Sequence, residues 1–109
     1  MSEDIITINE VMNDGRAIHL YYSEMYKEYV AYGLSAYIAC QRNRNIEAMP
    51  YMSYSSDLQM PMVRIESAAL ETLRRELIVK KSTKEYVCLY DVRPINEAQY
   101  VKWATWLRG

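Results

Sequence analysis

The chain has 109 residues, of which half are hydrophobic and a quarter are charged, and its formal net charge is −1. This size and composition are typical of one globular domain, and the small net charge gives no general attraction to nucleic acid or anionic membranes. No apolar run is long enough to cross a bilayer, and the acidic start lacks the pattern of a secretory signal. We therefore expect a cytoplasmic protein without a membrane or nucleic-acid partner.

The aromatic content is unusual, because the chain has eleven tyrosines and two tryptophans but no phenylalanine. Tyrosine combines an apolar ring with a polar hydroxyl, which suits half-buried positions and interfaces. Two explanations are open at this point. The core is so thin that all its aromatic side chains reach the surface, or the tyrosines form a surface that binds a partner.

The first predicted element is a short helix near the N-terminus. Thr7-Ile8-Asn9-Glu10 matches a capping box, in which the first and last side chains each bond the other residue's backbone N–H. A helix of one or two turns would follow and end near Asn13-Asp14-Gly15, where glycine suits the left-handed C-terminal position. A short strand at Ile5–Ile8 is the alternative.

The longest apolar and aromatic stretch covers residues 17–40. In its second half, large and small side chains alternate, and this period of two is typical of a strand. We predict two antiparallel strands, Arg16–Tyr22 and about Glu28–Gln41, joined by a turn at Ser23–Lys27. The competing interpretation is one long helix, which Gly33 and the weak helix propensity of Tyr, Val and Ile disfavour.

An extended second strand would carry a strip of small side chains between tyrosines. The strip and its flanks consist of Ala31, Gly33, Ser35 and Ala39, with Tyr29, Tyr37, Tyr21 and His19. Small residues allow close approach of another backbone, so the strip would accept either another subunit or the chain's own helices. The sequence leaves both possibilities open.

The segment Asn45–Gln59 shows no sustained period and is rich in Pro, Ser and Asp, which predicts a loop. Methionine and tyrosine side chains are nevertheless concentrated here and just beyond: Met49, Tyr51, Met52, Tyr54 and Met60. Methionine adapts its shape and recurs at surfaces that bind partners, and long loops are often functional. The alternative is a lid that folds back over the core.

The C-terminal half predicts two strands and two helices. Pro61–Glu66 reads as a strand, an amphipathic helix follows over Ala68–Lys81, and Glu85–Val92 reads as the next strand. The last element is a helix over Glu97–Arg108.

The last predicted helix has a clear start and a clear inner face. Asn96 is a good N-cap, and Gln99 stands at the matching capping-box position. The inner face consists of Tyr100, Trp103, Ala104 and Leu107. Trp106 points away from this face, toward solvent or another subunit.

These elements predict an α+β fold, a two-layer sandwich in which a mixed sheet of about four strands carries two helices on one face. The first two strands form a hairpin. The strand–helix–strand unit over 61–92 would pair its strands in parallel through a right-handed crossover. No internal repeat or linker is visible, so we expect one domain over 1–109.

Candidate chemical groups are few. His19 is the only histidine, and beside Cys40 or Cys88 it would serve a thiol nucleophile oriented by Asp91. A surface histidine and packed cysteines are the plainer interpretation. The sequence has no ligand pair at zinc-like spacing and no glycine-rich phosphate loop, so we expect neither metal nor cofactor.

Three hypotheses of function follow. The first is a non-catalytic interaction domain that forms a homo-oligomer or binds another protein. Its predicted binding residues are Met49, Tyr51, Met52, Tyr54, Met60, Tyr29, Tyr37, Tyr21 and His19. The second is an enzyme or small-ligand binder with a pocket beneath 49–62, polarised by His19, Tyr21 and Asp91. The third, a nucleic-acid binder, is disfavoured by the charge balance.

Overall fold

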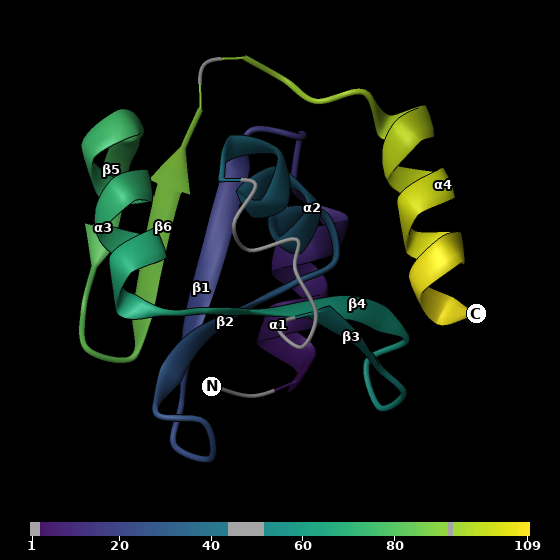
Figure 1. Ribbon diagram of the computed structural model, residues 1–109, viewed down its shortest axis with the longest axis horizontal. Helices are drawn as coiled ribbons and strands as arrows, with labels where there is room; N and C mark the ends of the chain where they lie inside the picture. Colours follow the sequence, from purple (N-terminus) through teal and green to yellow (C-terminus); the bar gives the residue numbers. More distant parts are fainter. Residues whose placement is uncertain (1–2, 44–51, 92) are drawn as a thin grey trace.

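The computed structural model describes residues 3–43, 52–91 and 93–109. Within these ranges, six strands form one antiparallel sheet in the order β3-β4-β2-β1-β6-β5, accompanied by four helices (Figure 1). The α+β class is therefore as the sequence predicts. The elements are α1 (Glu3–Val11), β1 (Ala17–Ser23), β2 (Glu28–Tyr32), α2 (Gly33–Arg42), β3 (Met52–Ser55), β4 (Met60–Ile65), α3 (Ser67–Glu76), β5 (Ile78–Ser82), β6 (Tyr86–Tyr90) and α4 (Glu97–Arg108).

The helices cover the sheet unequally. Apolar side chains of α2, α3 and α4 share one core with one face of the sheet, and in Figure 1 α2 lies between α3 on the left and α4 on the right. The fully buried members of this core include Ile18, Leu20, Ile38, Ile65, Leu73 and Leu89. Tyr21 lies on the opposite face, because it follows Leu20 along the strand, and its hydroxyl accepts a hydrogen bond from Asn9 Nδ2 of α1 (2.9 Å). α1 therefore packs against the other face.

The first hairpin forms as predicted. β1 and β2 pair antiparallel with Leu20 opposite Ala31, and the turn between them includes Lys27 in the left-handed region at φ 54°.

The second predicted strand is wrong beyond Tyr32, where the chain passes directly from β2 into α2. All residues from 33 to 40 are buried, so the helix has no polar side and its sequence lacks the usual amphipathic period. Gly33 allows the abrupt change because its φ is +55°, and a Cβ atom there would lie 3.0 Å from Met60 Sδ. The predicted strip of small residues is therefore not a surface.

The predicted loop over 45–59 is wrong at Met52–Ser55, which form β3, whereas residues 56–59 are a turn. β3 and β4 form an antiparallel hairpin at one edge of the sheet, with Met52 opposite Val63. Residues 44–51 lie outside the described ranges.

The predicted helix over 68–81 ends five residues early. α3 stops at Glu76, and the β-branched pair Ile78-Val79 opens β5, which pairs antiparallel with β6. The prediction of a parallel strand–helix–strand unit is therefore wrong. The sheet has six strands that all pair antiparallel, whereas the sequence predicted a mixed sheet of about four strands. A register shift between Val79 and Lys81 marks a bulge in this edge strand.

The last helix is confirmed together with its cap. The Asn96 side-chain oxygen accepts hydrogen bonds from the N–H groups of Ala98 (2.9 Å) and Gln99 (3.3 Å). Tyr100, Trp103 and Leu107 pack on the core, as their spacing predicts. None of the helices in the described ranges is long and apolar enough to span a membrane.

The predicted N-terminal capping box is wrong, because α1 begins at Glu3 and Thr7 lies inside it. Glu10 does cap a helix, but that helix is α2, which lies more than twenty residues further along the chain.

Candidate functional site

The carboxyl group of Glu10 sits at the N-terminus of α2. Its Oε1 accepts from the Ser35 N–H (2.9 Å), and its Oε2 is 2.6 Å from the Ser35 hydroxyl oxygen. Tyr32, the N-cap position of α2, provides no side-chain hydrogen bond to the helix. Glu10 therefore satisfies a backbone donor that the local sequence leaves without a cap.

The same cluster completes the edge of β1. Because β2 leaves the sheet at Tyr32, the first residues of β1 lose their partner strand on that side. The Ser35 hydroxyl oxygen accepts from the His19 N–H (2.9 Å), and Asn13 Nδ2 donates to the Ala17 carbonyl (2.8 Å). Side chains thus replace the missing strand as hydrogen-bond partners.

The electrostatic setting of Glu10 is unusual. Glu10 is only 9% exposed, and burial raises its pKa from 4.5 to about 7, against the opposing effect of hydrogen bonds from Ser35 and Asn13. Its hydrogen-bond partners are neutral, and no ion pair of Glu10 occurs among the described residues. The group therefore changes charge near neutral pH without a cation beside it.

A cavity of about 250 Å³ opens next to this carboxyl group, where the end of α1, the start of α2 and the start of α4 meet. Its lining consists of Glu10, Val11, Asn13, Leu34, Glu97, Tyr100 and Val101. Two of these side chains are carboxylic acids and none is basic. We call this space the Glu10 cavity.

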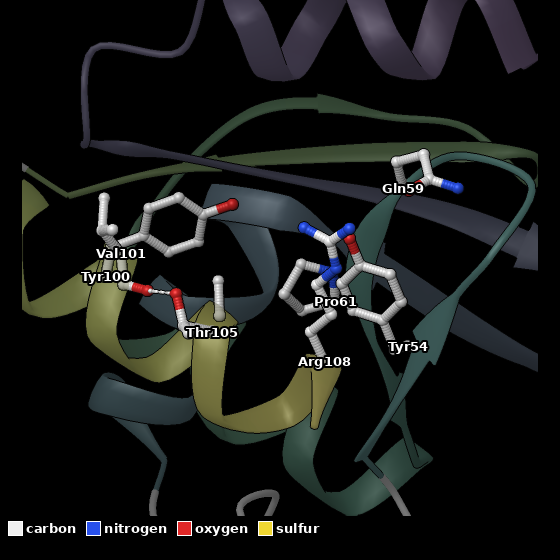
Figure 2. Close-up of a pocket in the computed structure, with 8 residues that line it drawn as sticks. Tyr54, Gln59, Pro61, Tyr100, Val101, Thr105 and Arg108 are labelled. Carbon is white, nitrogen blue, oxygen red and sulfur yellow. Dashed lines mark hydrogen bonds between the residues drawn. The ribbon is translucent and has the colours of Figure 1, made fainter.

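A second hollow of about 160 Å³ lies on the other side of Tyr100 and Val101. Figure 2 shows the Arg108 side chain extending from α4 toward Tyr54 and Pro61 of the β3–β4 hairpin. Part of the segment 49–62 therefore does line a hollow, as the small-ligand hypothesis expects. However, the proposed polar groups of that pocket, His19, Tyr21 and Asp91, line neither hollow.

His19 and Cys88 do meet, directly opposite each other on β1 and β6. His19 Nδ1 is 2.6 Å from the Tyr86 hydroxyl, and the two rings are stacked. Burial lowers the pKa of His19 and raises the pKa of Cys88, so both side chains stay neutral around neutral pH. This setting opposes the thiolate–imidazolium pair that a cysteine nucleophile needs.

Asp91 is fully engaged elsewhere. It is buried, its Oδ2 pairs with Arg42 Nε, and its Oδ1 accepts from the Arg93 N–H (2.9 Å). Burial alone would raise the pKa of Asp91, but the hydrogen bonds from Arg93 and Arg42 lower it overall. Asp91 thus ties the end of β6 to the end of α2 and does not orient His19.

The sequence-predicted binding residues do not come together on one surface. Met52, Tyr37 and Tyr21 are buried, and Tyr37 packs against Tyr100 and Trp103 of α4. The Tyr29 hydroxyl donates to the Lys84 carbonyl (2.7 Å).

The remaining predicted residues lie in three places. His19 is half-buried beside Tyr86, Tyr54 lines the second hollow, and Met60 lies next to Gly33. Met49 and Tyr51 lie outside the described residues.

Sequence reasoning missed the outer side of α1. This helix buries only Ile6 and Glu10, whereas Ile8 and Val11 are 55% and 78% exposed, and Met12, the residue directly after the helix, is 78% exposed. Val101 of α4 is also exposed and shares the rim of the Glu10 cavity with Val11. The i, i+3, i+4 spacing of Ile8, Val11 and Met12 was the available signal, because it places them on one side of a helix. We call these four residues the α1–α4 surface.

Among the described residues, no group of three or more His, Cys, Asp and Glu side chains is arranged to hold a metal ion. No family model, curated protein or solved structure matches the chain. What the protein binds must therefore be inferred from the chemistry of its surfaces.

Proposed function

We propose that the protein is a non-catalytic interaction domain that self-associates through the α1–α4 surface. The observation that carries this proposal is the orientation of α1, which buries a glutamate and leaves Ile8, Val11 and the following Met12 exposed to solvent. A row of exposed aliphatic side chains beside a cavity is typical of a protein-binding surface.

Charge favours a particular part of a second copy as the occupant. The charged residues of α1 are all acidic: Glu3, Asp4 and Glu10. Two α1 helices facing each other would therefore repel. β5 is exposed along its whole length and carries Ile78 and Val79 beside two lysines, so it complements α1 in both apolar character and charge. Contact between α1 of one copy and β5 of the next joins different surfaces, which produces a ring or an open series.

Sedimentation equilibrium over a range of protein concentrations tests this proposal. We expect reversible association of the wild type, weakened at least about tenfold by Met12→Lys, because a buried unpaired ammonium group costs well over 1 kcal/mol. Met25→Lys is the matched control, since Met25 is 83% exposed in the β1–β2 turn, outside the proposed interface. This control should associate like the wild type.

Three results would contradict the proposal. The wild type stays monomeric at high concentration, or both lysine variants weaken association equally, or added salt fails to weaken it. The last outcome would exclude β5 as the partner surface, because ionic attraction is screened by salt.

A further inference from the structure

The Glu10 cavity combines aliphatic walls with carboxyl groups that have no basic side chain beside them in its described lining. Val11, Leu34 and Val101 supply the aliphatic lining, and the Tyr100 ring adds an aromatic surface. Its ionisable carboxyl groups belong to Glu10 and Glu97, and its lining includes no lysine, arginine or histidine from the described part of the chain.

The two buried acids among the described residues, Glu10 and Asp91, differ in one respect. Asp91 has guanidinium groups from Arg42 and Arg93 beside it. Among the residues that the structure describes, Glu10 has only neutral partners, and it lines the cavity instead. A buried carboxylate without a counterion is costly, so a cation that enters the cavity would stabilise the ionised form.

We propose that the Glu10 cavity binds a primary aliphatic ammonium group, with its charge at the carboxyl groups of Glu10 and Glu97 and its alkyl chain against Val11, Leu34 and Val101. The cavity has room for roughly eight waters at liquid density, which is ample for a short alkylamine. The Tyr100 ring would add a cation–π attraction. This proposal does not rest on self-association.

NMR titration with n-butylammonium chloride at a pH about one unit above the Glu10 pKa tests the binding. We expect saturable shifts of the Leu34 and Val101 amide signals. n-Butanol, which has the same chain without the charge, and butyrate, which has the opposite charge, should bind at least about tenfold more weakly. The pKa of Glu10, followed by its carboxyl carbon shift, should fall when the amine is bound.

Variants identify the groups that hold the charge. Glu10→Gln and Glu97→Gln should each weaken n-butylammonium binding at least about tenfold, whereas Glu71→Gln on the exposed side of α3 should not. Glu97 is exposed, so its variant keeps the test valid even if Glu10→Gln alters the fold. Absence of saturable shifts, equal binding of n-butanol, or full binding by both cavity variants would overturn the proposal.

The source of the ammonium group is decided by sedimentation in saturating n-butylammonium chloride, with sodium chloride at the same concentration as control. Dispersal of the wild-type assembly by the amine alone would identify a lysine of a second copy. Unchanged assembly with persistent NMR shifts would identify a free small amine. If the wild type is monomeric, the proposed function fails, but the titration still decides the chemistry of the cavity.

Discussion

Glu10 connects three parts of the molecule through one carboxyl group. It caps α2, it holds the Ser35 hydroxyl that serves the edge of β1, and it faces the cavity beside α4. In its protonated form it would donate to the Ser35 hydroxyl oxygen, and a glutamine amide would do the same. Glu10→Gln is therefore a close mimic of the protonated protein.

The pH dependence of stability tests this description of Glu10. Between pH 4.5 and about 7 the folded protein holds a proton at Glu10 that the unfolded chain releases, so the free energy of unfolding falls as pH rises, by about 3 kcal/mol in total. Glu10→Gln removes this loss. Urea denaturation should show that the free energy of unfolding falls less between about pH 5 and about pH 8 in the variant than in the wild type.

Two further groups set the controls for that measurement. Burial lowers the pKa of His19, so the stability that His19 contributes to the folded protein is lost as pH falls below 6.5. This loss is the same in the wild type and in Glu10→Gln. Glu71→Gln on α3 should keep the wild-type decline. If Glu10→Gln declines as steeply as the wild type, the carboxyl group is not the buried titrating group described here.

At the scale of elements, α4 contributes Tyr100 and Val101 to both hollows, so its position determines the shape of each. Asn96→Ala removes the side-chain cap of α4 and should cost about 1 kcal/mol in the free energy of unfolding. Asn96→Asp keeps an oxygen acceptor and should cost little. Chemical denaturation measures both, and an equal loss in the two variants would show that the cap does not stabilise the helix.

Elements with one buried and one exposed side could be predicted from the sequence, and elements without that contrast could not. The β1–β2 hairpin and α4 show clear periods and a matching turn or cap. α2 is buried on every side, so its chance alternation of large and small residues reads as a strand. β5 follows α3 so closely that the leucine spacing carries the predicted helix past Glu76, although Ile78-Val79 favours a strand.

The candidate site was harder to predict than the fold. Glu10 is recognisable as a capping residue from its neighbours, but a local motif cannot show that it caps a helix more than twenty residues away. The cavity depends on the approach of α1, α2 and α4, which no short-range pattern specifies. Met52 and Tyr37, which the sequence suggested as binding residues, lie in the core instead, because methionine and aromatic side chains are also common in cores.

At the scale of the whole molecule, the sheet has a protected centre and one bare edge. Among the described strands, β1 pairs with β2 on one side and β6 on the other, whereas β5 pairs with β6 alone and is exposed throughout. Native-state hydrogen exchange should therefore be slowest in β1 and β2 and fastest among the strands in β5. If copies associate through β5 as proposed, the β5 amides should gain protection as the protein concentration rises. Protection of β5 equal to that of β1 at low concentration would contradict the sheet order.

The direct passage from Tyr32 to Gly33 has a mechanical consequence. β2 lies between β1 and β4 in the sheet, and the helix that lines the Glu10 cavity continues from it without a connecting loop. Because no loop separates the two elements, a tilt of that helix is transmitted directly to β2. A molecule that pushes Leu34 outward would therefore shift the hydrogen-bonded strands at the centre of the sheet. Amide signals of Val30 and Ala31 should then respond to an occupant that touches neither residue.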